Sequence, residues 1–287
     1  MKRGKIALVL TGGGAKGAFQ AGVMKELFKK IIPDVFIGTS IGAFNSAIIL
    51  GSEDLEKNAE KLEKYWMNIR KKDFFPFGIK TILSFITKKH LYHLNVFKKI
   101  IKKRLRNDSF NSLSKPLYIL TARAEDKKPV YFSEGPVIKP VLASLSLHPL
   151  YPPIKINKEY YIDGGYSGEI GIKKAEEIGC DVIIIINLAP YSTITDIENR
   201  GMDIFSKIIN IKEASSAFPI ILEALYSKRI EKEIKNIRKS KIIEIKIDEK
   251  FSFMDLNFNH LPEMIKNGEE KTEKILNSKR VKRILSI

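Results

Sequence analysis

The N-terminal part of the chain contains two short apolar segments, and each runs directly into a glycine-containing turn followed by a helical pattern. Ile6–Leu10 leads into Thr11-Gly-Gly-Gly-Ala-Lys-Gly17, and Val35–Ile37 leads into Gly38-Thr-Ser-Ile-Gly42. A strand, a tight turn and a helix, repeated in succession, are typical of a parallel sheet with covering helices. This opening predicts an α/β fold with both turns at one edge of the sheet.

The rest of the chain continues the same alternation of helical and strand patterns. Helical patterns are predicted at 53–106, 137–145, 173–178, from 188 to about 239, and at the C-terminus, and strands at 116–122, 130–132, 160–162, 181–187 and 242–247. Proline-rich turns are expected at Pro149 and Pro152-Pro153. No internal repeat or linker-like segment interrupts the 287 residues, so a single domain over 1–287 is predicted.

Composition excludes several classes of protein. Cys180 is the only cysteine, so neither an intramolecular disulfide nor a cysteine-based zinc site is expected, and four histidines leave little material for a metal centre. The longest apolar run, Val182–Ile186, has the length of a strand and not of a membrane span, which predicts a soluble intracellular protein. The net charge of +17 favours anionic partners, which are nucleic acid, a phospholipid surface or acidic substrates.

Three interpretations compete for the glycine loop, whose Gly12, Gly14 and Gly17 match the spacing of a dinucleotide fingerprint. That fingerprint needs an acidic residue after the second strand, where this chain has Gly38-Thr39-Ser40 instead. A P-loop needs Gly-Lys-Ser/Thr after four intervening residues, whereas this loop has Lys16-Gly17-Ala18, so that interpretation fails. The third interpretation is an oxyanion hole of bare amides before a helix. The loop alone leaves the nucleotide and oxyanion interpretations open.

Ser40 favours the oxyanion interpretation. Its place between a strand and a helix, with Gly38 and Gly42 two positions away on either side, is the pattern of a nucleophile elbow. The glycines are needed there because strand and helix approach too closely for side chains. A serine that only caps a helix remains the alternative.

A nucleophilic serine needs a base, and the chain offers two kinds. Ser40, Asp163 and His260 follow the order of an α/β-hydrolase triad, but only two strands precede Ser40, and His260 is better placed to start a helix. His90 and His93 are expected in solvent, whereas His148 in its turn is a possible lining residue.

Asp163 is the better candidate base, because it ends a strand at the sheet edge where Ser40 is expected and is followed by Gly164 and Gly165. An ordinary Asp-Gly turn is the alternative. A carboxylate with a pKa of about 3.9 is a poor base at neutral pH, so Asp163 would have to lie directly against the serine in a water-poor pocket.

Taken together, Gly12-Gly-Gly-Ala-Lys-Gly17, Gly38-Thr-Ser-Ile-Gly42 and Asp163-Gly-Gly165 resemble the patatin-like phospholipase family in its short microbial form. Ala143-Ser144 and the stretch 149–153 are also similar, and the resemblance covers roughly residues 5–190. It implies a three-layer α/β/α fold with a mostly parallel central sheet, and a Ser–Asp dyad that needs no metal or cofactor. The region at about 53–110, a helical insertion rich in basic and aromatic residues, is where such proteins vary and where substrate choice would be set.

The resemblance also assigns roles to individual residues. Ser40 matches the nucleophile and Asp163 the base, while Gly12, Gly13 and Gly14 match the oxyanion loop. Lys16 falls at the family's basic position in that loop. The supporting motif positions are Gly17, Gly38, Gly42, Gly164 and Gly165.

The expected function is hydrolysis of fatty acyl esters of phospholipids or lysophospholipids through an acyl-enzyme, in the cytoplasm or at the membrane periphery. Alternatives are a general carboxylesterase or thioesterase acting on small soluble esters, and a non-catalytic membrane- or nucleic-acid-binding protein. The intact motifs speak against the last, so no nucleic-acid partner is expected. The oligomeric state is left open.

The segment from Trp66 to Arg106 is a candidate surface for transient contact with an anionic membrane. Its only acidic residue is Asp73, and its cations alternate with aromatic residues, a mixture suited to a bilayer interface. The same mixture suits single-stranded nucleic acid, and it also arises when aromatic residues form core and lysines a solvated face. The aromatic residues are Trp66, Phe74, Phe75, Phe77, Phe85, Tyr92 and Phe97; the cations are Arg70, Lys71, Lys72, Lys80, Lys88, Lys89, Lys98, Lys99, Lys102, Lys103, Arg104 and Arg106.

Overall fold

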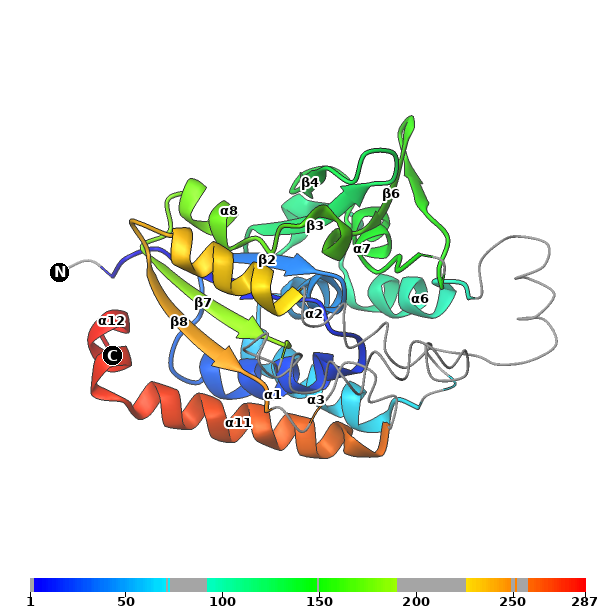
Figure 1. Ribbon diagram of the computed structural model, residues 1–287. Helices are drawn as coiled ribbons and strands as arrows, with labels where there is room; N and C mark the ends of the chain where they lie inside the picture. The colour runs from blue at the N-terminus through cyan, green and yellow to red at the C-terminus, as the bar shows by residue number, and fades with distance from the viewer. Residues whose placement is uncertain are drawn as a thin grey trace, which may run out of the picture.

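A computed structural model describes residues 3–70, 72, 92–148, 150–189, 226–248, 251 and 258–287 (Figure 1). The strands are β1 (Ile6–Leu10), β2 (Val35–Thr39), β3 (Leu117–Arg123), β4 (Pro129–Phe132), β5 (Ile154–Ile156), β6 (Glu159–Asp163), β7 (Val182–Asn187) and β8 (Lys241–Lys246). The α-helices are α1 (Gly17–Phe28), α2 (Ile41–Leu50), α3 (Leu55–Asn68), α6 (Asn95–Arg104), α7 (Ile138–Ser144), α8 (Ile172–Glu177), α11 (Leu261–Asn277) and α12 (Lys279–Leu285). Residues 226–236 are also helical. Short 3-10 turns occur at η1 (Gly14–Lys16), η2 (Phe110–Ser112), η3 (Gly164–Ser167) and η4 (Phe258–His260).

The eight strands of the described residues belong to one sheet. Its order is β5-β6-β3-β2-β1-β7-β8, with β4 paired to β3 beside this path. The central run from β3 to β8 is parallel, whereas β4 and β6 pair with β3 in the antiparallel sense. The prediction of a mostly parallel central sheet is confirmed.

Helices cover both faces of this sheet, and the residues of each strand alternate between the two sides. Ile6, Leu8 and Leu10 of β1 pack in a core with α1, α2, α3 and α11, while Ala7 and Val9 pack in a second core with α8 and the helix at 226–236. In Figure 1, α11 runs below the sheet and α8 lies above it. The fold is therefore three-layered, α/β/α, as predicted.

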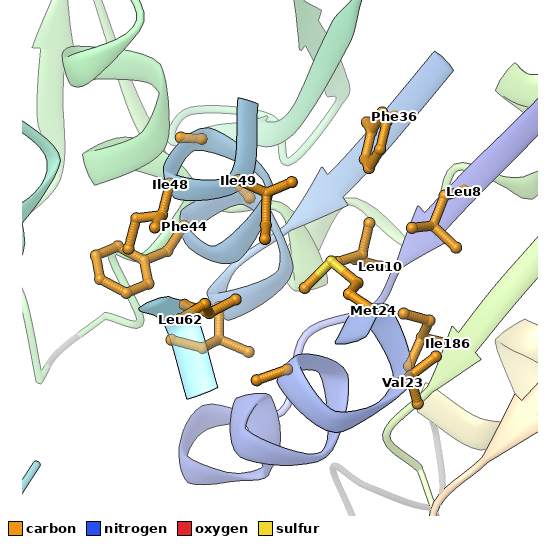
Figure 2. Packing of buried hydrophobic residues seen from close by; sticks show 14 of the residues in the cluster. Leu8, Leu10, Val23, Met24, Phe36, Phe44, Ile48, Ile49, Leu62 and Ile186 are labelled. Atoms are coloured by element: carbon orange, nitrogen blue, oxygen red, sulfur yellow. The ribbon is translucent and has the colours of Figure 1, made fainter. Parts of the chain in front are cut away.

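The larger core joins the first α/β units to one another. Figure 2 shows Leu10, Phe36 and Ile186 from neighbouring strands facing Met24 of α1 and Ile49 of α2. All of these side chains are buried. At about 25 cal/mol per Å² of apolar surface removed from water, such residues dominate the stability of the fold, and they fix the strand ends from which the two glycine turns extend.

Two elements differ from the sequence-based expectations. No element was predicted directly after the turn at Pro152-Pro153, but Ile154–Ile156 forms β5, an edge strand that makes a hairpin with β6. The strand is only three residues long, and the prolines just before it, Pro152 and Pro153, indicated a turn. The expected helical region from 188 to about 239 is helical at 226–236, while 190–225 lie outside the described residues.

The basic and aromatic segment separates into core and surface. Trp66 and Phe97 are both buried, so neither ring is available to enter a membrane interface. The four lysines of α6 are exposed (Lys98, Lys99, Lys102 and Lys103). Phe74, Phe75, Phe77 and Phe85, with Lys71, Lys80, Lys88 and Lys89, lie outside the described residues. Within the described ranges, no helix has the length and apolarity needed to cross a membrane.

Candidate active site

Ser40 lies at the sharp turn between β2 and α2 in a strained backbone conformation. Its φ is 54° and its ψ is −122°, outside the regions that a residue with a side chain normally adopts. The close approach of strand and helix explains the flanking glycines. A Cβ on Gly42 would lie 2.2 Å from the carbonyl oxygen of Leu10, and one on Gly38 would lie 2.6 Å from the Cα of Ala43. Strain of this kind persists where the surrounding structure imposes it.

Ser144, at the end of α7, fixes the backbone of this turn. Its hydroxyl oxygen accepts a hydrogen bond from the Ser40 amide at 2.7 Å and donates to the carbonyl oxygen of Leu120 at 2.7 Å. Ser144 is fully buried, so both bonds are shielded from water. The sequence pointed to Ser144 only through the family resemblance and gave it no role.

The glycine loop lies directly beside the serine. A Cβ on Gly12 would lie 3.1 Å from the Cβ of Ser40, so the loop and the elbow are in contact. The amides of Gly13 and Gly14 donate to no other residue in the described part of the chain. The Gly12 amide instead donates to the hydroxyl oxygen of Tyr226 at 3.0 Å. Of the three predicted oxyanion donors, the amides of Gly13 and Gly14 are therefore available in the described structure, whereas the Gly12 amide already donates a hydrogen bond to Tyr226.

A network of buried polar side chains supports the start of the glycine loop at Thr11. The Gln20 side chain donates to the carbonyl oxygen of Thr11 at 2.8 Å, and Asn45 donates to the Gln20 side-chain oxygen at 2.9 Å. Trp66 Nε1 then donates to Asn45 Oδ1 at 3.1 Å. Each of these side chains is fully buried. The network ties α1, α2 and α3 to the loop, and its satisfied hydrogen bonds keep the amides in place.

Asp163 lies level with the serine, but the direction of its strand differs from the expected one. The sequence suggested that Asp163 and Ser40 would share the carboxyl edge of the sheet, but β6 runs antiparallel to β3. β3 extends beyond the end of β2, pairing Leu120 with Thr39 and Thr121 with Asp163. The aspartate is therefore level with the elbow although its strand points the other way.

The carboxylate of Asp163 is buried, with 5% of the residue exposed. Burial raises its pKa to about 6, and hydrogen bonds from the Ser40 side chain and the Gly165 amide lower it in part. The Gly165 amide donates to Asp163 Oδ1 at 2.8 Å. A desolvated carboxylate with a raised pKa, in contact with a strained serine, is typical of a functional site.

The remaining motif residues shape the same region. A Cβ on Gly164 would lie 2.4 Å from the carbonyl oxygen of Leu120, and one on Gly17 would lie 2.6 Å from Trp66 Cζ2. Lys16 is buried, with 1% of the residue exposed. The two glycines therefore allow the backbone to pack closely next to the aspartate and the start of α2.

The histidines do not join this cluster in the described structure. His260 is the N-cap residue of α11, as its sequence context suggested. His93 and His148 are exposed, and the His148 carbonyl oxygen accepts a hydrogen bond from Tyr166 at 2.7 Å. His90 and Pro149 lie outside the described residues. Nor does the described structure contain a group of three or more His, Cys, Asp or Glu side chains that could hold a metal ion.

Two side chains that sequence reasoning missed come from the helix at 226–236. The Tyr226 hydroxyl oxygen accepts a hydrogen bond from the Gly12 amide, and Arg229 Nη1 donates one to the carbonyl oxygen of Gly165 at 2.8 Å. Both lie far along the chain from the residues they contact, and no local motif marks either of them.

The site and fold define an α/β protein with a serine elbow, a glycine loop and a buried aspartate. A family model described as patatin-like phospholipase matches residues 8–175. The chain belongs to the patatin-like phospholipase family.

Curated relatives share part of the chain. Lysophospholipase nte1 of Aspergillus terreus is 30% identical over 184 residues, which make up 64% of this chain and 12% of that protein. Lysophospholipase NTE1 of Coccidioides immitis is 27% identical over 184 residues, again 64% of this chain and 11% of that protein. The matched region thus spans only about an eighth of the relatives' length.

Solved structures are also similar. VipD from Legionella pneumophila is 15% identical, with a TM-score of 0.47, covering 96% of this chain and 67% of that chain. The type III effector protein ExoU is 12% identical, with a TM-score of 0.45, covering 96% of this chain and 54% of that chain.

Proposed function

We propose that this chain is a serine acyl hydrolase that cleaves fatty acyl esters of phospholipids or lysophospholipids with a Ser40–Asp163 dyad. The observation that carries the proposal is the buried Asp163 carboxylate next to Ser40: burial raises its pKa to about 6, and the interaction with the Ser40 side chain lowers that pKa in part. The strained backbone of Ser40 and its place beside the glycine loop support the same role.

The first half of the reaction forms an acyl-enzyme. Ser40 Oγ attacks the ester carbonyl carbon while its proton passes to the Asp163 carboxylate, and the carbonyl electron pair moves to oxygen. Backbone amides of the glycine loop stabilise this oxyanion, and each such donor is typically worth ~3 kcal/mol. When the tetrahedral intermediate collapses, the leaving alcohol takes the proton from Asp163.

Water completes the cycle. Asp163, again ionised, accepts a proton from a water molecule that attacks the acyl carbonyl, and the acid product leaves as Ser40 recovers its proton. A raised pKa serves both halves, because a carboxyl that titrates closer to neutral pH is a stronger base when ionised. Direct contact with the serine removes the need for an intervening imidazole.

Substrate class is inferred from the family and from surface charge. The relatives are named lysophospholipases, and the family is one of phospholipases. The exposed lysines of α6 provide cations for phosphate headgroups, at about 1 kcal/mol each near an anionic surface. Ser40 directly follows the C-terminal end of β2, which is the arrowhead of that strand in Figure 1. α6 lies on the side of the molecule toward which this arrow points. We therefore propose transient adsorption to lipid surfaces from the cytoplasm.

The test is release of free fatty acid from three substrates: phosphatidylcholine–phosphatidylglycerol vesicles, lysophosphatidylcholine micelles and p-nitrophenyl butyrate. Wild type is expected to cleave at least one of the lipids, and Ser40→Ala is expected to lose that activity by more than a thousandfold. Ser46→Ala, which alters a buried serine in the same helix region, serves as the control. Full activity of Ser40→Ala would overturn the proposal, and hydrolysis of the butyrate alone would replace it with a general carboxylesterase.

A further inference from the structure

The hydroxyl group of Tyr226 lies against the glycine loop beside the proposed nucleophile. A Cβ on Gly12 would lie 3.1 Å from the Cβ of Ser40 and 3.6 Å from the Tyr226 hydroxyl oxygen. Serine and phenol therefore approach the same point of the loop. The negative charge of Asp163 also acts on the phenol, which places the hydroxyl within the electrostatic reach of that carboxylate.

The helix at 226–236 holds Tyr226 firmly in this position. Ile230 is fully buried in the core shared with α8. Arg229 binds the carbonyl oxygen of Gly165 next to the aspartate. The Glu233 carboxylate accepts hydrogen bonds from the backbone amides of Ile170, Ile172 and Lys173 at 2.6, 2.9 and 3.2 Å. These contacts tie the helix to the Asp163 loop and to the start of α8, so the phenol is preorganised.

The hydrogen-bond inventory of Tyr226 leaves its proton available. A phenol can donate one hydrogen bond and accept others. Tyr226 accepts from the Gly12 amide, but within the described part of the chain its proton has no acceptor. Burial and the charge on Asp163 raise the pKa of the phenol, so it stays protonated at neutral pH. Tyr226 is thus equipped to donate a hydrogen bond and not to act as a base.

We propose that Tyr226 is a catalytic residue whose hydroxyl donates a hydrogen bond to the oxyanion formed when Ser40 attacks the ester. This inference rests on the proposed function. The Gly12 amide then acts through the phenol, while the amides of Gly13 and Gly14 contact the oxyanion directly. A hydrogen bond accepted by a hydroxyl strengthens the one that it donates. No proton leaves Tyr226 at any step, because the charge returns to the carbonyl when the intermediate collapses.

The test compares Tyr226→Phe with Tyr166→Phe. Tyr166 is a matched control, since burial and the charge on Asp163 also raise its pKa but its proton is already donated to the His148 carbonyl oxygen. On p-nitrophenyl butyrate, Tyr226→Phe is expected to lower kcat about 10²-fold with little change in KM, the effect of removing one oxyanion donor. The Ki of a trifluoromethyl ketone, which forms a tetrahedral adduct with the serine, should rise by the same factor. Tyr166→Phe should change both by less than threefold.

Other outcomes would overturn the inference. Higher activity in Tyr226→Phe would mean that the hydroxyl blocks the oxyanion hole, and unchanged activity would mean that it only packs. A fall in kcat without a rise in the ketone Ki would place its effect elsewhere. Thermal unfolding of both variants checks that they are folded. A wild-type chain without Ser40-dependent hydrolysis would refute the proposed function. Ser40-dependent hydrolysis that is unchanged by Tyr226→Phe would refute only the role of Tyr226.

Discussion

The hydroxyl oxygen of Ser144 accepts the amide hydrogen of Ser40 at 2.7 Å, so α7 determines the position of the elbow backbone. The same hydroxyl donates to the carbonyl oxygen of Leu120 in β3. One buried side chain thus connects the proposed nucleophile to the strand that lies between β2 and β6. The alignment of Ser40 with Asp163 depends on that connection.

Ser144→Ala should therefore reduce both stability and activity. It leaves the Ser40 amide without its hydroxyl partner in a buried site, which typically costs about 1–3 kcal/mol in the free energy of unfolding. A looser elbow should also lower kcat about tenfold or more. Urea unfolding and ester hydrolysis measure the two effects.

The control is Ser46→Ala, because the hydroxyl of Ser46 is equally buried but, among the described residues, bonds only to the Gly42 carbonyl oxygen within its own helix. It should cost less than 1 kcal/mol in unfolding free energy. Equal losses of activity in the two variants would contradict a special role for Ser144.

The rate should depend on pH through Asp163. Its pKa is raised to about 6 and the base must be ionised, so kcat/KM is expected to rise with pH, with a midpoint near pH 6 and a plateau above about pH 7. An uncharged soluble ester is the appropriate substrate, because its own charge does not change. A midpoint near pH 4 would indicate a solvent-exposed carboxylate and contradict the buried geometry.

Asp163→Asn should stabilise the protein at neutral pH. The folded-state pKa lies above the unfolded value, so the folded state binds the proton more tightly, and wild-type stability falls as pH rises from about 4 to 6. Asparagine carries no charge and can still accept from the Gly165 amide. The variant should therefore gain roughly 1–3 kcal/mol in unfolding free energy at pH 8. Calorimetry at several pH values should show this gain disappear near pH 4, and a pH-independent difference would contradict the linkage.

The α6 lysines should control binding to anionic vesicles. Replacing Lys98, Lys99, Lys102 and Lys103 with glutamine is expected to weaken sedimentation with phosphatidylglycerol vesicles by more than tenfold at low salt. The matched control replaces the exposed Lys228, Lys232, Lys235 and Lys239, which removes the same charge from another surface. Equal losses from the two sets would show that binding depends on net charge and not on α6.

The sequence predicted those parts of the fold and site that have local causes. Gly38 and Gly42 mark the elbow because strand and helix meet there within the chain itself. Asp163-Gly-Gly165 marks a strand end in the same way. The unbroken apolar runs of β1 and β7 indicated buried strands, because strands covered on both faces are apolar throughout.

Long-range contacts left no such signal. The bond between the Gly12 amide and Tyr226 spans 214 positions, and the one between Trp66 and Asn45 joins separate helices. The direction of β6 was equally hidden, because its residues are compatible with either pairing and only the length of β3 brings Asp163 level with Ser40. The sequence also left undecided whether Trp66 and Phe97 lie in the core or at the surface, and the structure buries both.

The most direct test of the central claim is labelling by a fluorophosphonate probe, which reacts only with an activated serine. Wild type should be labelled at Ser40, Ser40→Ala should not be labelled, and Asp163→Asn should react at least a hundredfold more slowly. Labelling of Ser40→Ala at the wild-type rate, or an unreactive wild type with its native unfolding transition, would contradict the dyad.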